Sequence, residues 1–344
     1  LKLFGVPLVF LSDSQKVLVY PSKGELIVKQ GMDFTFAGRV HAGTFNFYAR
    51  GVDFNYDQFQ LDMPVIDSMS FSVPSFERDE FGFRKQVRVR NVISDLGGGL
   101  YIDDPNNKSG LKDFPEYPIF SSTKDAYVYY DHPSIQNGVY DREKFYFYLY
   151  PFNIDSLDNF KTDLLEFPGY LASAGIFPDI EDTLRVQRDY SLGLQTSTPE
   201  IGYETYGGKG RYYANISLNN EGLRGQGYLD YLTSRSWSEN FMFFPDSLNA
   251  MADKFIIEEQ FDPVEYPAVT SSNVWQHWVP YDDYMSVKYT LIPFDMFNGQ
   301  SELLGMLVLT PEALKGAGLM SFEDAEMSSK LYSFKQHEIF ADSA

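Results

Sequence analysis

Alternation of hydrophobic and polar residues is the main signal along this chain. The segments Asp33-Phe34-Thr35-Phe36, Thr44-Phe45-Asn46-Phe47 and Gln86-Val87-Arg88-Val89 place an apolar side chain at every second position. Because successive side chains of a strand point to opposite faces, this pattern predicts half-buried β-strands. The densest aromatic example covers residues 144–150, and Pro151 ends it. Helical patterns are sparse, and we expect only three short helices, at 156–166, 247–255 and 321–332.

One long stretch of the chain recurs. Residues 218–231 (LNNEGLRGQGYLDY) match residues 309–322 (LTPEALKGAGLMSF) after 91 positions, with the leucines, the acid, the base and both glycines in register. Weaker copies lie upstream, since similar glycine triplets are separated by 87, 89 and 91 positions. The glycines are expected at strand-connecting turns or at close backbone approaches. These repeat glycines are Gly51, Gly138, Gly225, Gly227, Gly316 and Gly318.

The repeat predicts an all-β chain of about four modules, each of about 89 residues. The boundaries are expected at 1–89, 90–176, 177–265 and 266–344, with the last module cut short. Modules without linkers should stack and cover one another's open strand edges, as solenoids do. We therefore expect an elongated, β-solenoid-like stack that forms a piece of a longer protein.

Composition narrows the choice of partners and compartment. The formal net charge is −20, which repels nucleic acid and anionic lipid headgroups, so neither is an expected direct partner. The chain has no cysteine, which excludes disulfides and thiolate metal sites and fits an oxidising compartment. No apolar run reaches the roughly 20 residues that a membrane helix needs.

Five Asp-Ser or Asp-Thr pairs precede a small or aliphatic residue. This pattern resembles the O-glycosylation acceptor motif that some Gram-negative bacteria use on extracytoplasmic proteins. The alternative is that Asp-Ser is a turn or helix-cap pair repeated with the module, and both interpretations stay open. The candidate acceptor residues are Ser68, Ser156, Thr183, Ser247 and Ser343.

Two further clusters are candidate binding sites. Asp103, Asp104 and Asn106 supply oxygen ligands that suit Ca²⁺, although a solvated turn explains them more simply. No other cofactor is expected. Trp275, Trp278 and Tyr281 are candidates for stacking on a sugar ring, but a packed aromatic strand and turn is the favoured interpretation.

No catalytic motif is present, so an enzyme is not expected. The four histidines lack metal-ligand spacing, and no nucleophile elbow or phosphate-binding loop occurs. Nothing in the sequence selects a catalytic pair from the 48 acidic residues.

The pattern Gly-x-Gly-x-aromatic, followed by Leu…Leu-Arg/Lys-Gly-x-Gly, occurs at 208–227 and in part at 305–318. It resembles large repetitive β-rich proteins of the Gram-negative cell envelope and is loosely similar to the AsmA/TamB group. The resemblance implies an extracytoplasmic location in the periplasm or at the cell surface, with other envelope proteins or glycans as partners.

The first functional hypothesis is a non-enzymatic scaffold or interaction protein of the envelope that is O-glycosylated and belongs to a larger assembly. A glycan-binding or glycan-degrading protein is the alternative. A lipid-transporting β-groove, or a section of an outer-membrane barrel, is a further one. On the first hypothesis the chain contacts a membrane only through partners or through missing parts of the protein.

Overall fold

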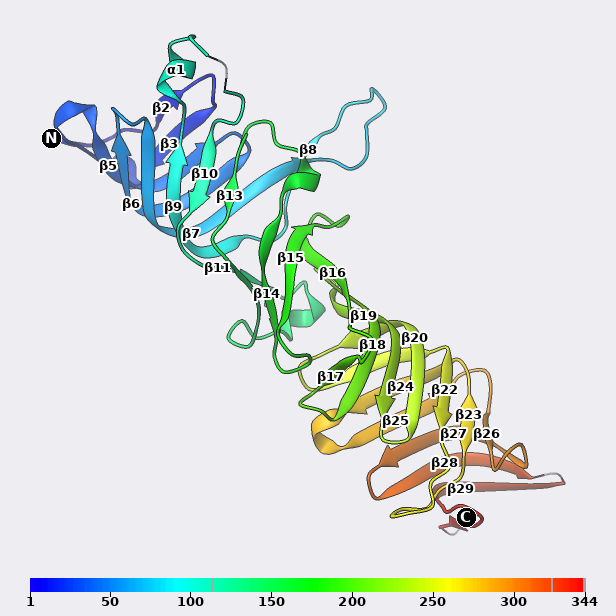
Figure 1. Ribbon diagram of the computed structural model, residues 1–344. Helices are drawn as coiled ribbons and strands as arrows, with labels where there is room; N and C mark the ends of the chain where they lie inside the picture. Colours follow the sequence, from blue (N-terminus) through cyan, green and yellow to red (C-terminus); the bar gives the residue numbers. More distant parts are fainter. Residues whose placement is uncertain (113, 323, 343–344) are drawn as a thin grey trace. The chain divides into compact units, whose positions relative to one another are not determined.

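The computed structural model describes residues 1–112, 114–322 and 324–342. Strands make up 57% of the chain and helices 5%, so the predicted all-β class is confirmed. The chain folds into two compact units, which are shown as ribbons in Figure 1. Unit 1 comprises residues 1–134, 145–172 and 180–194, and unit 2 comprises residues 135–144, 173–179 and 195–344.

Unit 1 is built around long antiparallel strands whose inward faces are aromatic. In β12 the residues alternate between buried Phe145, Phe147 and Leu149 and half-exposed tyrosines. Ring pairs such as Phe45–Phe71, with centroids 5.0 Å apart, fill the core. The strands are β1 (Lys2–Leu3), β2 (Val9–Ser12), β3 (Val17–Pro21), β4 (Leu26–Val28), β5 (Phe34–Ala42), β6 (Phe45–Asn55), β7 (Gln60–Pro74), β8 (Gln86–Arg88), β9 (Ile93–Tyr101), β10 (Ile119–Ser122), β11 (Ala126–Tyr129), β12 (Phe145–Leu149), β13 (Asn153–Ile154), β14 (Phe167–Ser173) and β15 (Ile180–Val186).

The longest segment of unit 2 begins within β16 (Leu192–Ser197). It contains two three-strand meanders, and eight of its strands close into a ring. The ring order is β20–β21–β24–β25–β27–β26–β23–β22, and β22 pairs back onto β20. The strands are β17 (Tyr203–Thr205), β18 (Gly210–Asn219), β19 (Gly222–Tyr231), β20 (Ser234–Phe243), β21 (Leu248–Ala252), β22 (Lys254–Ile257), β23 (Val269–Ser271), β24 (Val274–Val279), β25 (Tyr284–Tyr289), β26 (Phe294–Met296), β27 (Ser301–Thr310), β28 (Ala313–Phe322), β29 (Ala325–Phe334) and β30 (Ile339–Ala341).

The ring has a packed interior. Phe255, Trp278, Val287 and Leu307 are each at most 1% exposed. Inward and outward residues alternate along each strand, as they do in small closed barrels whose side chains fill the centre. Hydrophobic burial therefore holds the ring together.

The stack of solenoid coils expected from the repeat is not what these strands form. The two copies of the 91-residue repeat are three-strand antiparallel meanders, β18–β19–β20 and β27–β28–β29, whose strands start at residues 210, 222 and 234 and at residues 301, 313 and 325. One strand of each meander, β20 and β27, belongs to the ring, where it pairs with shorter strands. The ring closes on itself. A sequence period shows that a unit recurs but does not show how successive copies join.

Helices are few and short, and the three that the sequence predicts are wrong. The segment 247–255 forms β21 and the start of β22, where Leu248, Ala250 and Ala252 alternate into the core. The segment 321–332 is largely β29, and 156–166 holds only the 3₁₀ turn η4. Pairing with neighbouring strands overrides weak helix propensity. The helical elements are α1 (Pro105–Lys108), η1 (Ser22–Gly24), η2 (Gln30–Met32), η3 (Gln136–Gly138), η4 (Thr162–Leu164) and η5 (Pro280–Asp282).

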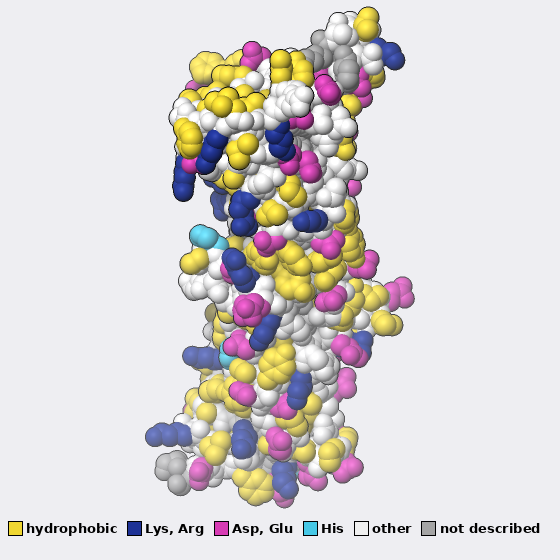
Figure 2. Space-filling model, turned by 90° about the vertical axis from the view of Figure 1, so that its left-hand side faces the viewer, with side chains coloured by type: hydrophobic (Ala, Val, Ile, Leu, Met, Phe, Trp, Pro, Cys, Tyr) yellow, Lys and Arg dark blue, Asp and Glu magenta, His cyan; other side chains and the backbone are white. Residues whose placement is uncertain are grey.

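The division into four modules stays a prediction. Among the described residues, no helix is long and apolar enough to cross a membrane. Charged side chains of both signs are interspersed with hydrophobic ones over the face that Figure 2 shows.

Candidate functional site

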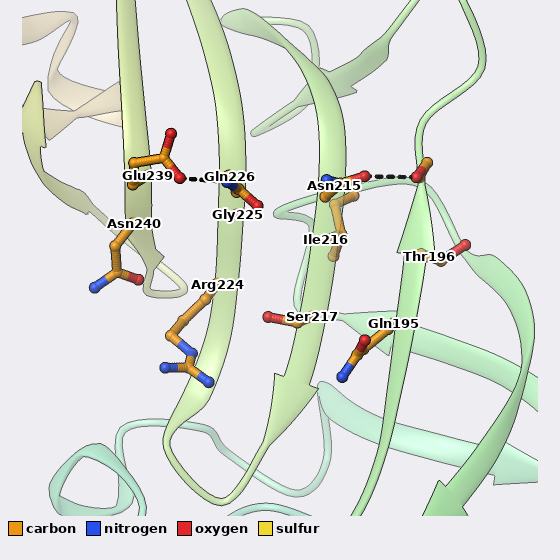
Figure 3. A pocket seen from close by; sticks show the side chains of 11 residues that line it. Gln195, Thr196, Asn215, Ile216, Ser217, Arg224, Gly225, Gln226, Glu239 and Asn240 are labelled. Atoms are coloured by element: carbon orange, nitrogen blue, oxygen red, sulfur yellow. Dashed lines mark hydrogen bonds between the residues drawn. The ribbon is translucent and has the colours of Figure 1, made fainter. Parts of the chain in front are cut away.

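A polar groove with a volume of about 580 Å³ lies on the outward face of unit 2. Its side chains come from four strands that lie side by side, β16, β18, β19 and β20 (Figure 3). The volume falls in the range of roughly 300–1,000 Å³ that is typical of small-molecule sites. The lining residues are Gln195, Thr196, Ser197, Asn215, Ile216, Ser217, Arg224, Gly225, Gln226, Glu239 and Asn240.

A β-bulge on β20 builds one wall of the groove. Gly225 pairs with Phe241 and Gly227 pairs with Ser238, so Glu239 and Asn240 together oppose the single residue Gln226. Such a bulge breaks the strict alternation of a strand. Both bulged side chains are therefore exposed on the groove side, where an unbroken strand would turn one of them inward.

Hydrogen bonds between side chains fix two sides of the groove. The amide of Gln226 donates to the Glu239 carboxylate, and the Ser197 hydroxyl donates to the Asn215 carbonyl oxygen over 2.8 Å (Figure 3). Each of these residues keeps further donors or acceptors for a ligand. The groove is thus ordered before anything binds.

Arg224 supplies the groove's guanidinium. Its Nη1 atom lies 2.5 Å from a carboxylate oxygen of Glu221, which neutralises part of its charge. Its Nε atom is buried and has no hydrogen-bond partner among the described residues. An unpaired buried N–H group costs free energy, so a hydrogen-bond acceptor for this atom would be stabilising.

A row of aromatic rings borders the groove. Each ring is two residues away, on its own strand, from a groove residue. Tyr213 stacks on Tyr228 with centroids 4.4 Å apart, and Trp237 lies 6.1 Å beyond Tyr228. The Arg235 guanidinium lies 4.9 Å from the Tyr228 ring centre, and the two hydrogen bonds that it donates to the Asp230 carboxylate hold it there and raise its pKa. The row forms a wall beside the groove on the same face of the sheet.

The second meander of unit 2 provides an internal comparison. At the positions 91 residues after Asn215, Gln226 and Asn240 it carries Met306, Ala317 and Leu331. At the positions of Tyr213, Tyr228 and Trp237 it has Leu304, Leu319 and Ser328. The same strand pairing therefore exists without the polar and aromatic side chains, so the fold alone does not require them.

The aromatic residues singled out from the sequence are separated by the structure. Trp275 is 43% exposed and Tyr281 is 54% exposed, whereas Trp278 is fully buried inside the ring. Trp278 packs against Tyr231 with ring centroids 5.0 Å apart. Because β24 alternates, its two tryptophans cannot face one sugar, and Trp278 is corrected from a stacking candidate to a core residue.

The Ca²⁺ candidates lie at the start of α1. Asp103 is 7% exposed and its carboxylate accepts a hydrogen bond of 2.6 Å from Asn107, while Asp104 accepts one from the backbone of Asn106. Among the described residues, no three acidic or histidine side chains cluster as metal ligands. These carboxylates order their own loop, and Ca²⁺ binding stays a prediction.

Of the repeat glycines, Gly138 lies in the turn η3 between β11 and β12, whereas the other five lie inside strands and not at the strand-connecting turns that one expectation placed them in. Gly225, Gly227, Gly316 and Gly318 lie inside β19 and β28, beside the bulges of the next strand. A Cβ on Gly227 would lie 2.0 Å from the Tyr213 carbonyl oxygen, so close backbone approach explains this position. Gly51 and Gly138 have φ angles of 65° and 73°, which favour glycine.

The described glycosylation candidates are only partly exposed. Ser68 and Thr183 lie within strands β7 and β15, and the hydroxyls of Ser156 and Ser247 donate to Pro115 and Asp246. Ser343 lies outside the described residues. Their modification stays a prediction.

A second aromatic surface, the tyrosine face, lies on unit 1. Six tyrosines of β11, β12 and β14 and the residue after β12 contact one another, with Tyr148 and Tyr170 stacked at 4.9 Å. The Tyr129 and Tyr150 hydroxyls donate to Asp95 and Glu181. The members are Tyr127, Tyr129, Tyr146, Tyr148, Tyr150 and Tyr170.

The groove could not be predicted from the sequence. Its residues are ordinary amides and hydroxyls that become neighbours only when four strands pair. The one signal was the doublet Glu239-Asn240, which interrupts the alternation between Trp237 and Phe243. Comparisons with protein-family models, with curated proteins and with solved structures find no match to this chain.

Proposed function

We propose that this chain is a non-enzymatic, extracytoplasmic scaffold protein that binds a glycan in the polar groove of unit 2. The observation that carries the proposal is the composition of the groove. Four amides and three hydroxyls line it, with one guanidinium and one carboxylate. Amides and hydroxyls both donate and accept hydrogen bonds, which is what the hydroxyl groups of a sugar require.

The aromatic wall supports the same ligand class. Aromatic rings offer apolar contact to the C–H groups of a sugar, and phenol hydroxyls add hydrogen bonds. Loss of these groups from the second meander supports a role in binding, because the strands form equally well there without them. The groove holds a segment of an oligosaccharide, and its openness to solvent permits a longer chain to extend beyond it.

Affinity electrophoresis of the full chain tests the proposal. The gels contain neutral polysaccharides (xylan, mannan, hydroxyethylcellulose) or acidic ones (pectin, alginate). At least one should retard the protein. The double substitution Asn215→Ala plus Gln226→Ala removes two hydrogen-bonding side chains. It should raise the dissociation constant obtained from the retardation at least tenfold, which corresponds to about 1.4 kcal/mol of binding free energy.

Two matched variants serve as controls. Lys330→Ala changes the residue that corresponds to Glu239 in the second meander, and Tyr148→Ala removes an aromatic residue from the tyrosine face of unit 1. Neither should alter retardation. The proposal is wrong if no polysaccharide retards the chain, or if Tyr148→Ala abolishes retardation while the groove variant keeps it.

A further inference from the structure

We propose a second binding site, for an oxyanion, in a recess on the outward face of unit 1. The recess has a volume of about 160 Å³ and is lined from strands β5, β6, β7 and β8. The chemical class of the ligand is a carboxylate, sulfate or phosphate group. The lining residues are Arg39, Asn46, Tyr48, Ser70, Phe71, Ser72 and Arg88.

Charge is the first argument for this site. The chain carries 48 acidic and 28 basic residues, yet two guanidiniums and no carboxylate line this recess. In the part of the chain that the structure describes, neither Arg39 nor Arg88 forms an ion pair. Two like charges in one recess repel each other, so an anion between them would be stabilising.

Pre-organisation is the second argument. Arg39 packs over the ring of Tyr20, with 4.1 Å between the guanidinium carbon and the ring centre. Such stacking fixes a guanidinium plane while leaving its edge free for the paired hydrogen bonds that an oxyanion accepts. Arg39 is therefore held in place without using the N–H groups that a ligand needs.

Several neutral lining residues also carry hydrogen-bond donors. His41 Nδ1 lies 3.1 Å from the Asn46 carbonyl oxygen, and a proton on Nδ1 leaves the Asn46 amide group as a donor. Asn46 pairs with Ser70 across β6 and β7, and Ser72 pairs with Arg88 across β7 and β8. Hydroxyls, an amide and two guanidiniums thus share one recess.

The size of the recess sets the kind of ligand. Its volume is below the roughly 300 Å³ at which sites for whole small molecules begin. It suits one anionic substituent whose remainder lies in solvent, because Arg88 and Tyr48 are exposed at its rim. The inference does not depend on the groove, because every residue of the recess belongs to unit 1.

Isothermal titration calorimetry of the full chain tests the site with three probes: sodium sulfate, sodium phosphate and sodium glucuronate. Each is titrated against a sodium chloride background of equal ionic strength, so that general screening cancels. At least one probe should give saturable binding at one site. The probe that binds most tightly identifies the group as sulfate, phosphate or carboxylate.

The double substitution Arg39→Gln plus Arg88→Gln should weaken that binding at least tenfold, whereas Arg84→Gln, an exposed arginine outside the recess, should leave it unchanged. Arg88→Lys alone keeps the charge and should weaken binding less than Arg88→Gln. Absence of saturable binding for all three probes overturns the inference. Equal weakening by Arg84→Gln does so as well, since it would show a general charge effect.

Discussion

At the scale of single residues, the ring interior of unit 2 contains polar groups where apolar ones would be expected. Gln276 is fully buried, and neither atom of its amide has a hydrogen-bond partner among the described residues. The hydroxyls of Ser236 and Ser301 are also buried and have no hydrogen-bond partner among the described residues. Such groups lower stability unless something satisfies them.

Gln276→Met should therefore raise the free energy of unfolding by about 1–3 kcal/mol, since it removes an unpaired buried amide and keeps the side-chain length. Urea denaturation monitored by tryptophan fluorescence measures this change. Gln226→Met, at an exposed position, is the control and should change stability little. A clear loss of stability in Gln276→Met would show that the amide takes part in a hydrogen-bond network.

At the scale of elements, bulges decide which side chains reach the surface. The bulge of β20 has a counterpart in β29, where Lys330 and Leu331 oppose Ala317 and are both exposed. The glycines of β19 and β28 lie beside these bulges. Their lack of a side chain lets neighbouring backbones approach closely.

Gly227→Ala tests this role. The new Cβ would lie 2.0 Å from the Tyr213 carbonyl oxygen, and backbone atoms cannot move aside as a flexible side chain can. We expect a loss of about 1–3 kcal/mol in the free energy of unfolding. Gly99→Ala is the matched control, because its nearest neighbour is the end of the Gln60 side chain at 3.1 Å. Equal effects of the two substitutions would contradict the assignment.

Strand positions could be predicted from the sequence, while the way the strands join could not. Phe145, Phe147 and Leu149 point inward as their alternation indicates. The ring closes through pairs such as Ser234–Ile257 and Met296–Ser301, which no local pattern specifies. The groove needs the same long-range pairing, because Gln195 and Glu239 meet only through β18 and β19. Trp278 lies in the core, as the favoured packed-strand interpretation had it, because Trp275 and Trp278 are three residues apart on β24 and face opposite sides of the strand.

At the scale of the whole molecule, buried tyrosines link stability to alkaline pH. Burial raises the pKa of Tyr140 to about 12. At the half-exposed Tyr148 the main cause is the hydrogen bond to Asp125, which with desolvation raises the pKa to about 12. Burial also raises the pKa of Tyr130, Tyr206 and Tyr212. The folded chain therefore keeps phenol protons that the unfolded chain releases near its ordinary pKa of 10.

Because the folded pKa lies above the unfolded one, the stabilisation is complete below pH 10 and is lost as the pH rises towards 12. We expect the urea midpoint to fall steadily from pH 9 to pH 11. Tyr140→Phe should make this fall shallower, although it also removes the 2.8 Å hydrogen bond to the Phe243 carbonyl. A urea midpoint independent of pH across this range would rule out the linkage.

The closed ring of unit 2 bears on how the chain behaves at high concentration. Every strand of the ring has a hydrogen-bonded neighbour on each side, including β20 and β27, which pair outward with β19 and β28. A strand paired on both sides offers no template to a strand from another molecule. The eight strands of the ring are rich in aromatic and aliphatic residues, yet they do not start β-sheets between molecules. Aggregation would have to start from strands outside it.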